Sequence, residues 1–184
     1  MRHLGTNTID TARLCLRRYR LDDAADMFRN YANDPRVTKF LSWQPYDDIE
    51  DVQKFIANQV ANYPDDKYHW AIEYQGQMIG GISVIRMDEK NHSCELGYCI
   101  GHDFWGLGLT TEATMAVLQY LFCQVGYHRV FAKHDVDNPA SGKVMQNCGM
   151  VYEGRLREHY RRHDGVFSDA LIYGILRKDF CHSS

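Results

Sequence analysis

The residues best suited to chemistry form a glycine turn between a strand and a helix, in the stretch Trp105-Gly106-Leu107-Gly108-Leu109-Thr110-Thr111-Glu112-Ala113. Glycine has no Cβ, so Gly106 and Gly108 allow a tight turn and a close approach of a ligand to the backbone. The first amides of the helix that follows have no partner inside the helix and carry the positive end of its dipole. This combination is typical of a pocket for phosphate oxygens.

Two glycines before a helix also suit a tight connection that binds nothing. The turn is not a P-loop, because no Gly-Lys-Ser/Thr follows it. It is not a dinucleotide fingerprint either, because the third glycine of that motif is missing. The segments around the turn therefore have to decide between a ligand site and a plain connection.

Those segments resemble the GNAT N-acetyltransferases, and in particular the RimJ/RimL type, which acetylates the N-termini of ribosomal proteins and many other amines. The resemblance rests on Glu95-Leu96-Gly97-Tyr98, on Trp105 to Ala113 and on Asn138-Pro139-Ala140-Ser141. It covers nearly the whole chain, from Thr11-Ala12-Arg13-Leu14 to Arg177-Lys178-Asp179-Phe180. The family usually has Gln or Arg in place of Trp105 and Gly or Ala in place of Thr110, whose β-branch would crowd a phosphate.

The resemblance implies that acetyl-coenzyme A is the co-substrate. In the family, the turn that matches Trp105, Gly106, Leu107, Gly108, Leu109 and Thr110 holds the pyrophosphate. The residue that matches Asn138 bonds the pantetheine arm, and the one that matches Ser141 faces the thiol. We expect the backbone amides of Tyr98, Cys99 and Ile100 to polarise the thioester oxygen.

Acyl transfer to an amine requires a neutral amine, a polarised thioester carbonyl and a proton for the departing thiolate. Glu95 lies in an apolar strand, where its carboxylate would be partly desolvated, so it is a candidate base, directly or through water. The alternative is a structural carboxylate paired with an arginine such as Arg86. Ser141 is either a plain helix-start serine or, as the resemblance implies, the group that donates a proton to the thiolate.

Further candidates each have a simpler structural interpretation. Trp43 and Tyr46 lie in a loop before a helix, where they either line the acceptor pocket or pack in the core or at a hinge. Lys143 either meets the 3′-phosphate of the coenzyme or is solvated. Tyr160 and His134 are lesser candidates for proton transfer, and each also suits a strand side chain with a polar tip.

Composition narrows the class of protein. A chain of 184 residues with 45% hydrophobic residues suits one domain, residues 1–184, with a substantial core. The net charge of −3 implies no basic field for nucleic acid. No apolar run approaches the roughly 18 residues that span a bilayer, and the N-terminus lacks the apolar core of a signal peptide, so we predict a cytoplasmic protein without a membrane partner. The six cysteines are scattered, which indicates free thiols rather than disulfides, and no metal site is expected.

The pattern of apolar residues predicts the elements that position these groups. We expect strands over Ile9–Tyr19, His69–Tyr74, Met78–Met87, Ser93–Ile100 and Arg129–Val136, and a hairpin of Met150–Tyr160 with Phe167–Leu176. Helices are expected over Asp22–Ala32, over Asp47–Tyr63, from Thr110 to Gly126 and from Asn138 to Gly149. This order suits an α/β protein with one central mixed sheet of about seven strands and helices on both faces. The resemblance implies that this sheet is the mostly antiparallel one of the GNAT fold.

The sequence therefore predicts an acetyl-coenzyme A-dependent N-acetyltransferase that acts on a primary amine by direct attack. The acceptor is either a protein N-terminal amine or a small molecule, and a homodimer is compatible with the sequence. The rival function is a non-catalytic acyl-coenzyme A-binding module that regulates a partner. Such a module would keep the glycine turn and need neither Glu95 nor Ser141.

Overall fold

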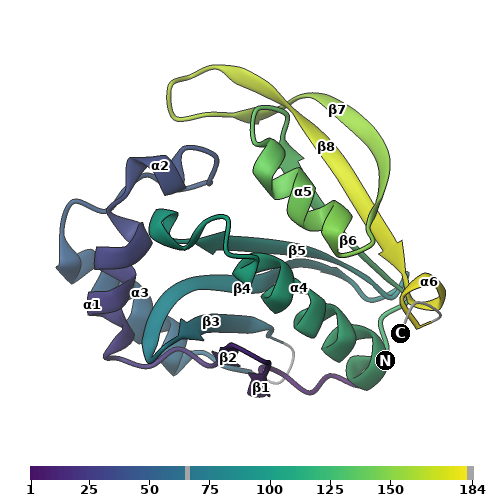
Figure 1. Cartoon of the computed structure of the whole chain (residues 1–184), viewed down its shortest axis with the longest axis horizontal. Coiled ribbons are helices and arrows are strands. Elements are labelled where there is room, and N and C mark those ends of the chain that lie inside the picture. Colours follow the sequence, from purple (N-terminus) through teal and green to yellow (C-terminus); the bar gives the residue numbers. More distant parts are fainter. Residues whose placement is uncertain (65–66, 182–184) are drawn as a thin grey trace. The chain divides into compact units, whose positions relative to one another are not determined.

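The computed structural model describes residues 1–64 and 67–181, and Figure 1 labels its elements along the chain. The chain divides into two compact units. The N-terminal unit comprises His3–Ser83 and Tyr98–Ala116, and the C-terminal unit comprises Met1–Arg2, Val84–Gly97 and the residues from Val117 onward. The strands are β1 (Ile9–Asp10), β2 (Leu14–Arg17), β3 (His69–Tyr74), β4 (Gln77–Asp88), β5 (Ser93–Ile100), β6 (Arg129–Asp135), β7 (Val151–Arg161) and β8 (Phe167–Leu176). The helices are α1 (Asp23–Met27), α2 (Pro35–Thr38), α3 (Ile49–Ala61), α4 (Leu109–Gln119), α5 (Pro139–Asn147) and α6 (Arg177–Cys181).

The strands follow the order β1-β2-β3-β4-β5-β6-β8-β7 in one eight-stranded sheet, and both β4 and β5 contain residues of each unit. β5 and β6 pair in parallel, whereas the pairs β1–β2, β2–β3, β3–β4, β6–β8 and β7–β8 are antiparallel. The predicted mixed and mostly antiparallel sheet is thus confirmed. Its strand count is eight rather than about seven, because the expected first strand is in fact two.

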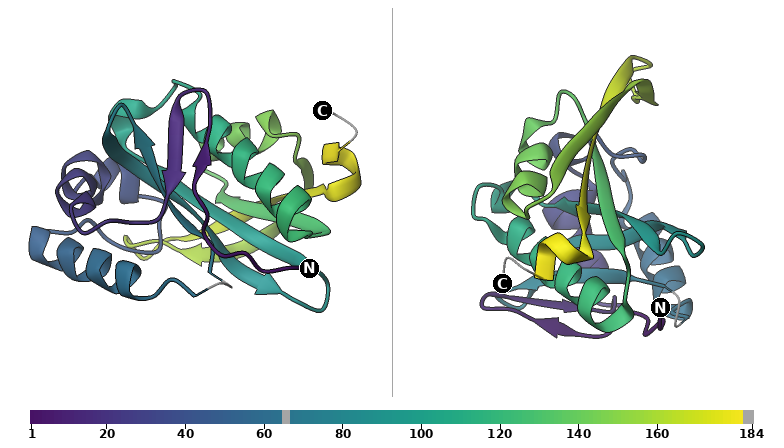
Figure 2. Two further views of the ribbon diagram at one scale, coloured as in Figure 1. Left: turned by 90° about the horizontal axis from the view of Figure 1, so that it is seen from below. Right: turned by 90° about the vertical axis from the view of Figure 1, so that its right-hand side faces the viewer.

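The N-terminal hairpin corrects the prediction of one strand over Ile9–Tyr19. β1 and β2 pair antiparallel, with Ile9 opposite Leu16, and Figure 2 shows this hairpin in purple. Thr11 makes the reversal, because its Oγ1 accepts a bond from the Leu14 amide and its own amide bonds the Leu14 carbonyl oxygen. Leu14 and Leu16 of β2 are both buried.

Carboxylates begin two of the helices in the N-terminal unit. The Asp48 side chain accepts the Glu50 amide at 2.9 Å and caps α3, and Asp34 accepts the Arg36 amide at 2.8 Å ahead of Pro35 and caps α2. Asp22, where we expected the first helix to begin, immediately precedes α1 and makes no side-chain cap bond. A π-helical turn over Phe28–Ala32 continues α1 to the residue where we expected the helix to end.

Two strands have the bounds that the sequence predicted. β3 covers His69–Tyr74, and β5 covers Ser93–Ile100. A bulge lies in β4 beside Gly80, since Ile72 pairs with Gly80 while Glu73 pairs with Met78, which leaves Ile79 as the extra residue. The core of the N-terminal unit contains the fully buried side chains of Trp70, Ile72, Ile56 and Tyr31.

The C-terminal unit contains β6, α5, the β7–β8 hairpin and α6, which follows β8 directly in Figure 2. α4 extends into this unit and continues as a π-helical turn over Tyr120–Val125, which ends at Gly126 in a left-handed conformation (φ +92°). Gly149 follows the C-cap of α5 in a left-handed conformation, with a φ of +77°. We did not predict α6, where Phe180 packs its ring against Phe122 at a centroid distance of 5.3 Å.

Candidate functional site

The glycine turn of the N-terminal unit has the backbone that its sequence predicted. Gly106 and Gly108 have φ values of +75° and +76°, and α4 begins at the next residue, Leu109. Alternating backbone conformations of this kind turn successive amides toward one side and form a concavity for anions. A Cβ on Gly106 would meet no atom within 4 Å. Such a turn is suited to phosphate oxygens.

Trp105 fastens the start of the turn to the end of β5. Its indole Nε1 donates to the Ile100 carbonyl oxygen at 2.9 Å, and its ring packs on His102 with centroids 4.7 Å apart. The amide of Gly101 donates to the Ile79 carbonyl oxygen at 2.8 Å. The peptide between Ile100 and Gly101 is thus bonded at both of its polar groups. A tryptophan in place of the family's usual Gln or Arg supplies this indole donor.

Arg13 and Glu112 join the N-terminal hairpin to the turn, and sequence reasoning missed both as site residues. Glu112 Oε1 accepts from Thr11 Oγ1 at 2.6 Å and from the Arg13 amide at 2.9 Å, and Glu112 Oε2 accepts from Arg13 Nε at 2.7 Å. Arg13 Nη1 donates to the Leu107 carbonyl oxygen at 2.9 Å. Burial raises the pKa of Glu112, but these hydrogen bonds and the charge of Arg13 outweigh it and lower that pKa overall.

The end of β5 carries the amides that we expected to polarise the thioester. The β5–β6 ladder runs from Ser93 opposite Arg129 to Leu96 opposite Ala132, so Tyr98, Cys99 and Ile100 lie beyond it. Burial raises the pKa of the Cys99 thiol to about 11, an effect that a bond with the Gly81 backbone partly offsets. Cys99 is therefore a protonated thiol at neutral pH and is a poor nucleophile.

Glu95 lies on β5 within the C-terminal unit and is paired with Lys133. Its Oε1 is 3.2 Å from Lys133 Nζ, and only 7% of the Glu95 side chain and 15% of the Lys133 side chain are exposed. Arg86, which we suggested as its partner, is exposed on β4. The correction has a simple cause, because Glu95 pairs with Phe131 in the parallel register and Lys133 follows on the same face of β6.

A bulge in β7 adds two further polar residues to this pair. The register of β7 with β8 shifts between Leu156 and Tyr160, and Glu158 has a φ of +50°, which is uncommon outside glycine. Within this bulge, His159 Nε2 lies 3.2 Å from Lys133 Nζ. Burial raises the pKa of Tyr160 to about 12, with smaller contributions from the charges of Glu95 and Asp135, so its hydroxyl keeps its proton at neutral pH. Sequence reasoning named Tyr160 but missed Lys133 and His159.

Asn138 and Ser141 lie together at the start of α5. Asn138 Oδ1 accepts the Ser141 amide at 3.3 Å, so Asn138 is the N-cap of the helix that we predicted to begin there, and Pro139 occupies the first turn. The Asn138 amide in turn donates to the Asp135 carbonyl oxygen at 2.8 Å. The turn from β6 to α5 therefore fixes both residues relative to β6.

The same turn is attached to the β7–β8 hairpin by Arg162. Its guanidinium bonds both carboxylate oxygens of the buried Asp135, and it also bonds Asp137 and Ser168. Ser168 Oγ donates to Asp135 Oδ1 at 2.7 Å. Burial raises the pKa of Asp135, yet these bonds and the charge of Arg162 lower it overall.

His134 lies beneath α5, against Gly142. Its Nδ1 is 2.8 Å from the Asp135 carbonyl oxygen, which indicates a protonated Nδ1. Its buried Nε2 has no hydrogen-bond partner in the part of the chain that the structure describes. The ring leaves no room for a side chain at Gly142, where a Cβ would stand 2.6 Å from that nitrogen. The geometry supports a packing role for His134.

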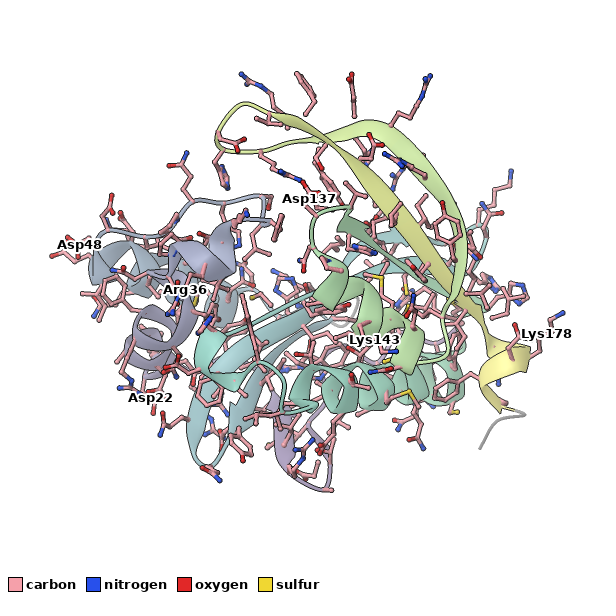
Figure 3. All side chains as sticks on the ribbon, turned by 45° about the horizontal axis from the view of Figure 1, so that its top comes forward. Asp22, Arg36, Asp48, Asp137, Lys143 and Lys178 are labelled. Atoms are coloured by element: carbon pink, nitrogen blue, oxygen red, sulfur yellow. The ribbon has the colours of Figure 1, made fainter. Side chains whose placement is uncertain are left out.

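The remaining candidates lie at the surface or on the core. Trp43 and Tyr46 are half-buried, stack with centroids 5.6 Å apart and pack on the core of the N-terminal unit, as a structural role requires. Lys143 is exposed on α5 (Figure 3). Within residues 1–64 and 67–181, no group of three or more His, Cys, Asp or Glu side chains could hold a metal ion. No helix in the same ranges is long and apolar enough to cross a membrane.

Comparison with known proteins places these features in a family. Residues 13–151 match the family model described as an acetyltransferase (GNAT) domain. The uncharacterized N-acetyltransferase YoaA of Bacillus subtilis (strain 168) is 30% identical over 172 residues, which are 92% of this chain and 96% of that protein. The ribosomal-protein-serine acetyltransferase of Escherichia coli (strain K12) is 31% identical over 136 residues, which are 72% of this chain and 75% of that protein.

A solved structure agrees with these relatives. The microcin C7 self immunity acetyltransferase MccE, solved in complex with acetyl-CoA and AMP, has a TM-score of 0.80 and 25% identity, covering 90% of this chain and 93% of that chain. The family model spans well over half of the sequence and includes the glycine turn, Glu95 and Ser141. The chain therefore belongs to the GNAT acetyltransferase family and is an N-acetyltransferase that uses acetyl-CoA as its co-substrate.

Proposed function

We propose that this enzyme acetylates a primary amine by direct attack of the amine on acetyl-CoA, and that the acceptor is a protein N-terminal α-amine, such as that of a ribosomal protein, or a small-molecule amine. The observation that carries the proposal is the left-handed glycine pair that opens α4, because it presents backbone amides suited to a pyrophosphate. The relative that acetylates a ribosomal-protein serine supports the protein acceptor. The cytoplasmic location, the single domain and a homodimer stay predictions.

In the proposed site, the amides from Leu107 to Thr110 bind the pyrophosphate, and those of Tyr98, Cys99 and Ile100 polarise the thioester oxygen. Asn138 uses its carboxamide oxygen as the cap of α5, so its amino group remains the donor for the pantetheine arm. Trp43 and Tyr46 are the proposed acceptor contacts. Most of these contacts to the coenzyme come from backbone amides, which every residue type except proline can supply.

Two residues manage protons in the proposed reaction. An ammonium cannot attack, because a proton occupies its lone pair, so Glu95 takes that proton directly or through water. The amine nitrogen then forms a bond to the acetyl carbon, the bond between that carbon and sulfur breaks, and the nitrogen releases its second proton to solvent to give the neutral amide. Ser141 Oγ donates a proton to the departing thiolate and regains one from solvent. Loss of either group should lower the rate by roughly 10²- to 10⁴-fold.

A panel of amines tests the function directly. The enzyme is incubated with acetyl-CoA and with peptides of differing N-terminal residues, polyamines, amino acids and aminoglycosides, and the released thiol is measured. We expect turnover on at least one class, with the acetyl group found on the acceptor amine by mass spectrometry. Binding of acetyl-CoA without turnover on every amine would favour the rival function, a non-catalytic acyl-CoA-binding module.

Substitutions of glycine test the turn. Gly108→Val should weaken coenzyme binding strongly, because its Cβ would stand 3.6 Å from Arg13 Nη2 and its branched side chain would crowd the guanidinium that bonds the Leu107 carbonyl oxygen. The φ of +76° also strains any branched residue there, by about 1–2 kcal/mol. Gly76→Val is the matched control, because Gly76 has a φ of +78° with no atom within 4 Å of its Cβ position and lies in the β3–β4 turn. Equal coenzyme affinity of the two folded variants in calorimetry would remove the turn from the site.

A further inference from the structure

The turn is held from outside by residues of the N-terminal hairpin. We propose that Arg13 and Glu112 are positioning residues that aim the amides of Gly108 and Leu109 at the pyrophosphate of the coenzyme. The inference rests on the proposed function of the turn, and it assigns a role to two residues that the proposed site does not use. All the residues concerned belong to the N-terminal unit.

The orientation of the first amide follows from the peptide that precedes it. Arg13 Nη1 bonds the Leu107 carbonyl oxygen at 2.9 Å. In a planar trans peptide, the C=O and N–H groups point in opposite directions. A guanidinium that fixes the Leu107 oxygen on the outer side of the turn therefore fixes the Gly108 N–H toward the inner side.

The second amide is fixed in the same way. The Glu112 amide donates to the Gly108 carbonyl oxygen at 3.1 Å, so the N–H of Leu109 also points away from that bond. The Glu112 carboxylate meanwhile accepts three bonds, from Thr11 Oγ1 and from the amide and Nε of Arg13. The two peptides that flank Gly108 are thus both bonded to one connected set of residues, which we call the Arg13–Glu112 clamp.

Charge and entropy both explain why such a clamp is useful. A carboxylate in the first turn of α4 would repel a phosphate at the same helix end, and Arg13 cancels that charge. Glycines have more conformational freedom to lose than other residues, so a turn with two of them has a large ordering cost on binding. Because the clamp orders the turn in the free enzyme, coenzyme binding does not have to supply that ordering free energy.

The test compares Arg13→Met with Arg20→Met. Arg20 is a matched control because it is an exposed arginine of the same unit whose guanidinium lies near Glu73 instead. Affinity is measured by calorimetry for coenzyme A, for dephospho-coenzyme A, which keeps the pyrophosphate but lacks the 3′-phosphate, and for pantetheine, which lacks all phosphates. We expect Arg13→Met to bind the two pyrophosphate ligands on the order of tenfold more weakly and to bind pantetheine with unchanged affinity. The loss of one hydrogen bond to a charged group corresponds to about a tenfold change in affinity or more.

A second measurement, hydrogen exchange, tests the order of the turn in the absence of a ligand. Hydrogen exchange of the peptide that covers residues 105–112 should be faster in Arg13→Met than in wild type and unchanged in Arg20→Met. Arg13→Lys keeps the charge but cannot bond Glu112 and the Leu107 oxygen with one planar fork. It should therefore lose most of the same affinity, and it provides a second variant if Arg13→Met does not fold.

Each contrary outcome has a distinct meaning. Unchanged affinity in Arg13→Met, or full affinity in Arg13→Lys, would overturn the inference. A loss for coenzyme A that disappears for dephospho-coenzyme A would show a direct contact of Arg13 with the 3′-phosphate, and an equal loss for pantetheine would show a general structural role; both also overturn it. If wild type binds coenzyme A no more tightly than pantetheine, the proposed site at the turn is wrong, and that result is visible before any variant is made.

Discussion

Replacing Lys133 by methionine should change both the stability of the enzyme and its dependence on pH. Lys133 Nζ and Glu95 Oε1 are 3.2 Å apart, and little of either side chain is exposed. At an effective dielectric constant of about 20, two unit charges at this distance attract by about 5 kcal/mol, before the cost of their desolvation is subtracted. Lys133→Met keeps the apolar stem but leaves the Glu95 carboxylate buried without its counter-charge.

We expect Lys133→Met to lower the free energy of unfolding at pH 7 by about 2–3 kcal/mol, somewhat below the usual cost of breaking a fully buried pair, because Lys133 keeps some access to solvent. A carboxylate without a neighbouring cation is protonated more easily, so the acidic limb of the kcat profile should move to higher pH if Glu95 is the base. Denaturant unfolding and kcat measured from pH 5 to 9 check the two effects separately.

The double variant and a control complete the design. Glu95→Gln with Lys133→Met removes both charges, so its stability should exceed that of Lys133→Met alone. Lys143→Met removes an exposed lysine from the same unit and should leave stability within about 0.5 kcal/mol of wild type. A Lys133→Met enzyme whose acidic limb stays in place would refute the argument that the Glu95 carboxylate sets this limb. A double variant no more stable than Lys133→Met would refute the argument that an unpaired charge causes the loss.

Three further predictions concern single residues. Ser141→Ala should lower kcat roughly 10²-fold or more with little change in coenzyme affinity, and by less with a thioester whose thiol leaves more easily, as steady-state kinetics and calorimetry can show. Trp43→Ala should raise the acceptor KM and spare coenzyme affinity; an equal loss of both, or a melted protein, would make Trp43 purely structural. Gly142→Ala should destabilise the enzyme by about 1–3 kcal/mol in denaturant unfolding although alanine favours helices, because its Cβ would stand 2.6 Å from His134 Nε2. Gly154→Ala, where a Cβ meets no atom within 4 Å, should be nearly neutral.

The local parts of the fold were predictable because their signals lie within a few residues. The bounds of β3 and β5 follow from alternation and from turn residues such as Gln75 and Gly76. The division of the first strand was missed because Thr11 makes the reversal with a side-chain bond and not with glycine or proline. The short helix α6 was missed because five residues show too little periodicity.

In the candidate site, too, the geometry that depends on neighbours in sequence was predictable and the geometry that depends on other elements was not. The glycine turn and the Asn138 cap depend on neighbours in sequence, so residue types and spacing were enough to predict their geometry. The partners of Glu95 and Glu112 come from other elements. Lys133 could have been found from the sequence only by pairing β5 with β6 in parallel, because it follows Phe131, the partner of Glu95, on the same face.

The β7 bulge shows why the rest of the site needs tertiary structure. No glycine marks the position of Glu158, whose left-handed conformation is held by a 2.7 Å bond from its amide to Asp169 on the neighbouring strand. Leu156 pairs with Ala170 and Tyr160 pairs with Ser168, so β7 has two more residues than β8 across the bulge, and the side chains beyond it keep their faces. His159, which reaches Lys133, is one of the residues inside the bulge. The polar surroundings of Glu95 are therefore set by the register of β6, β8 and β7 as much as by the residue types on those strands.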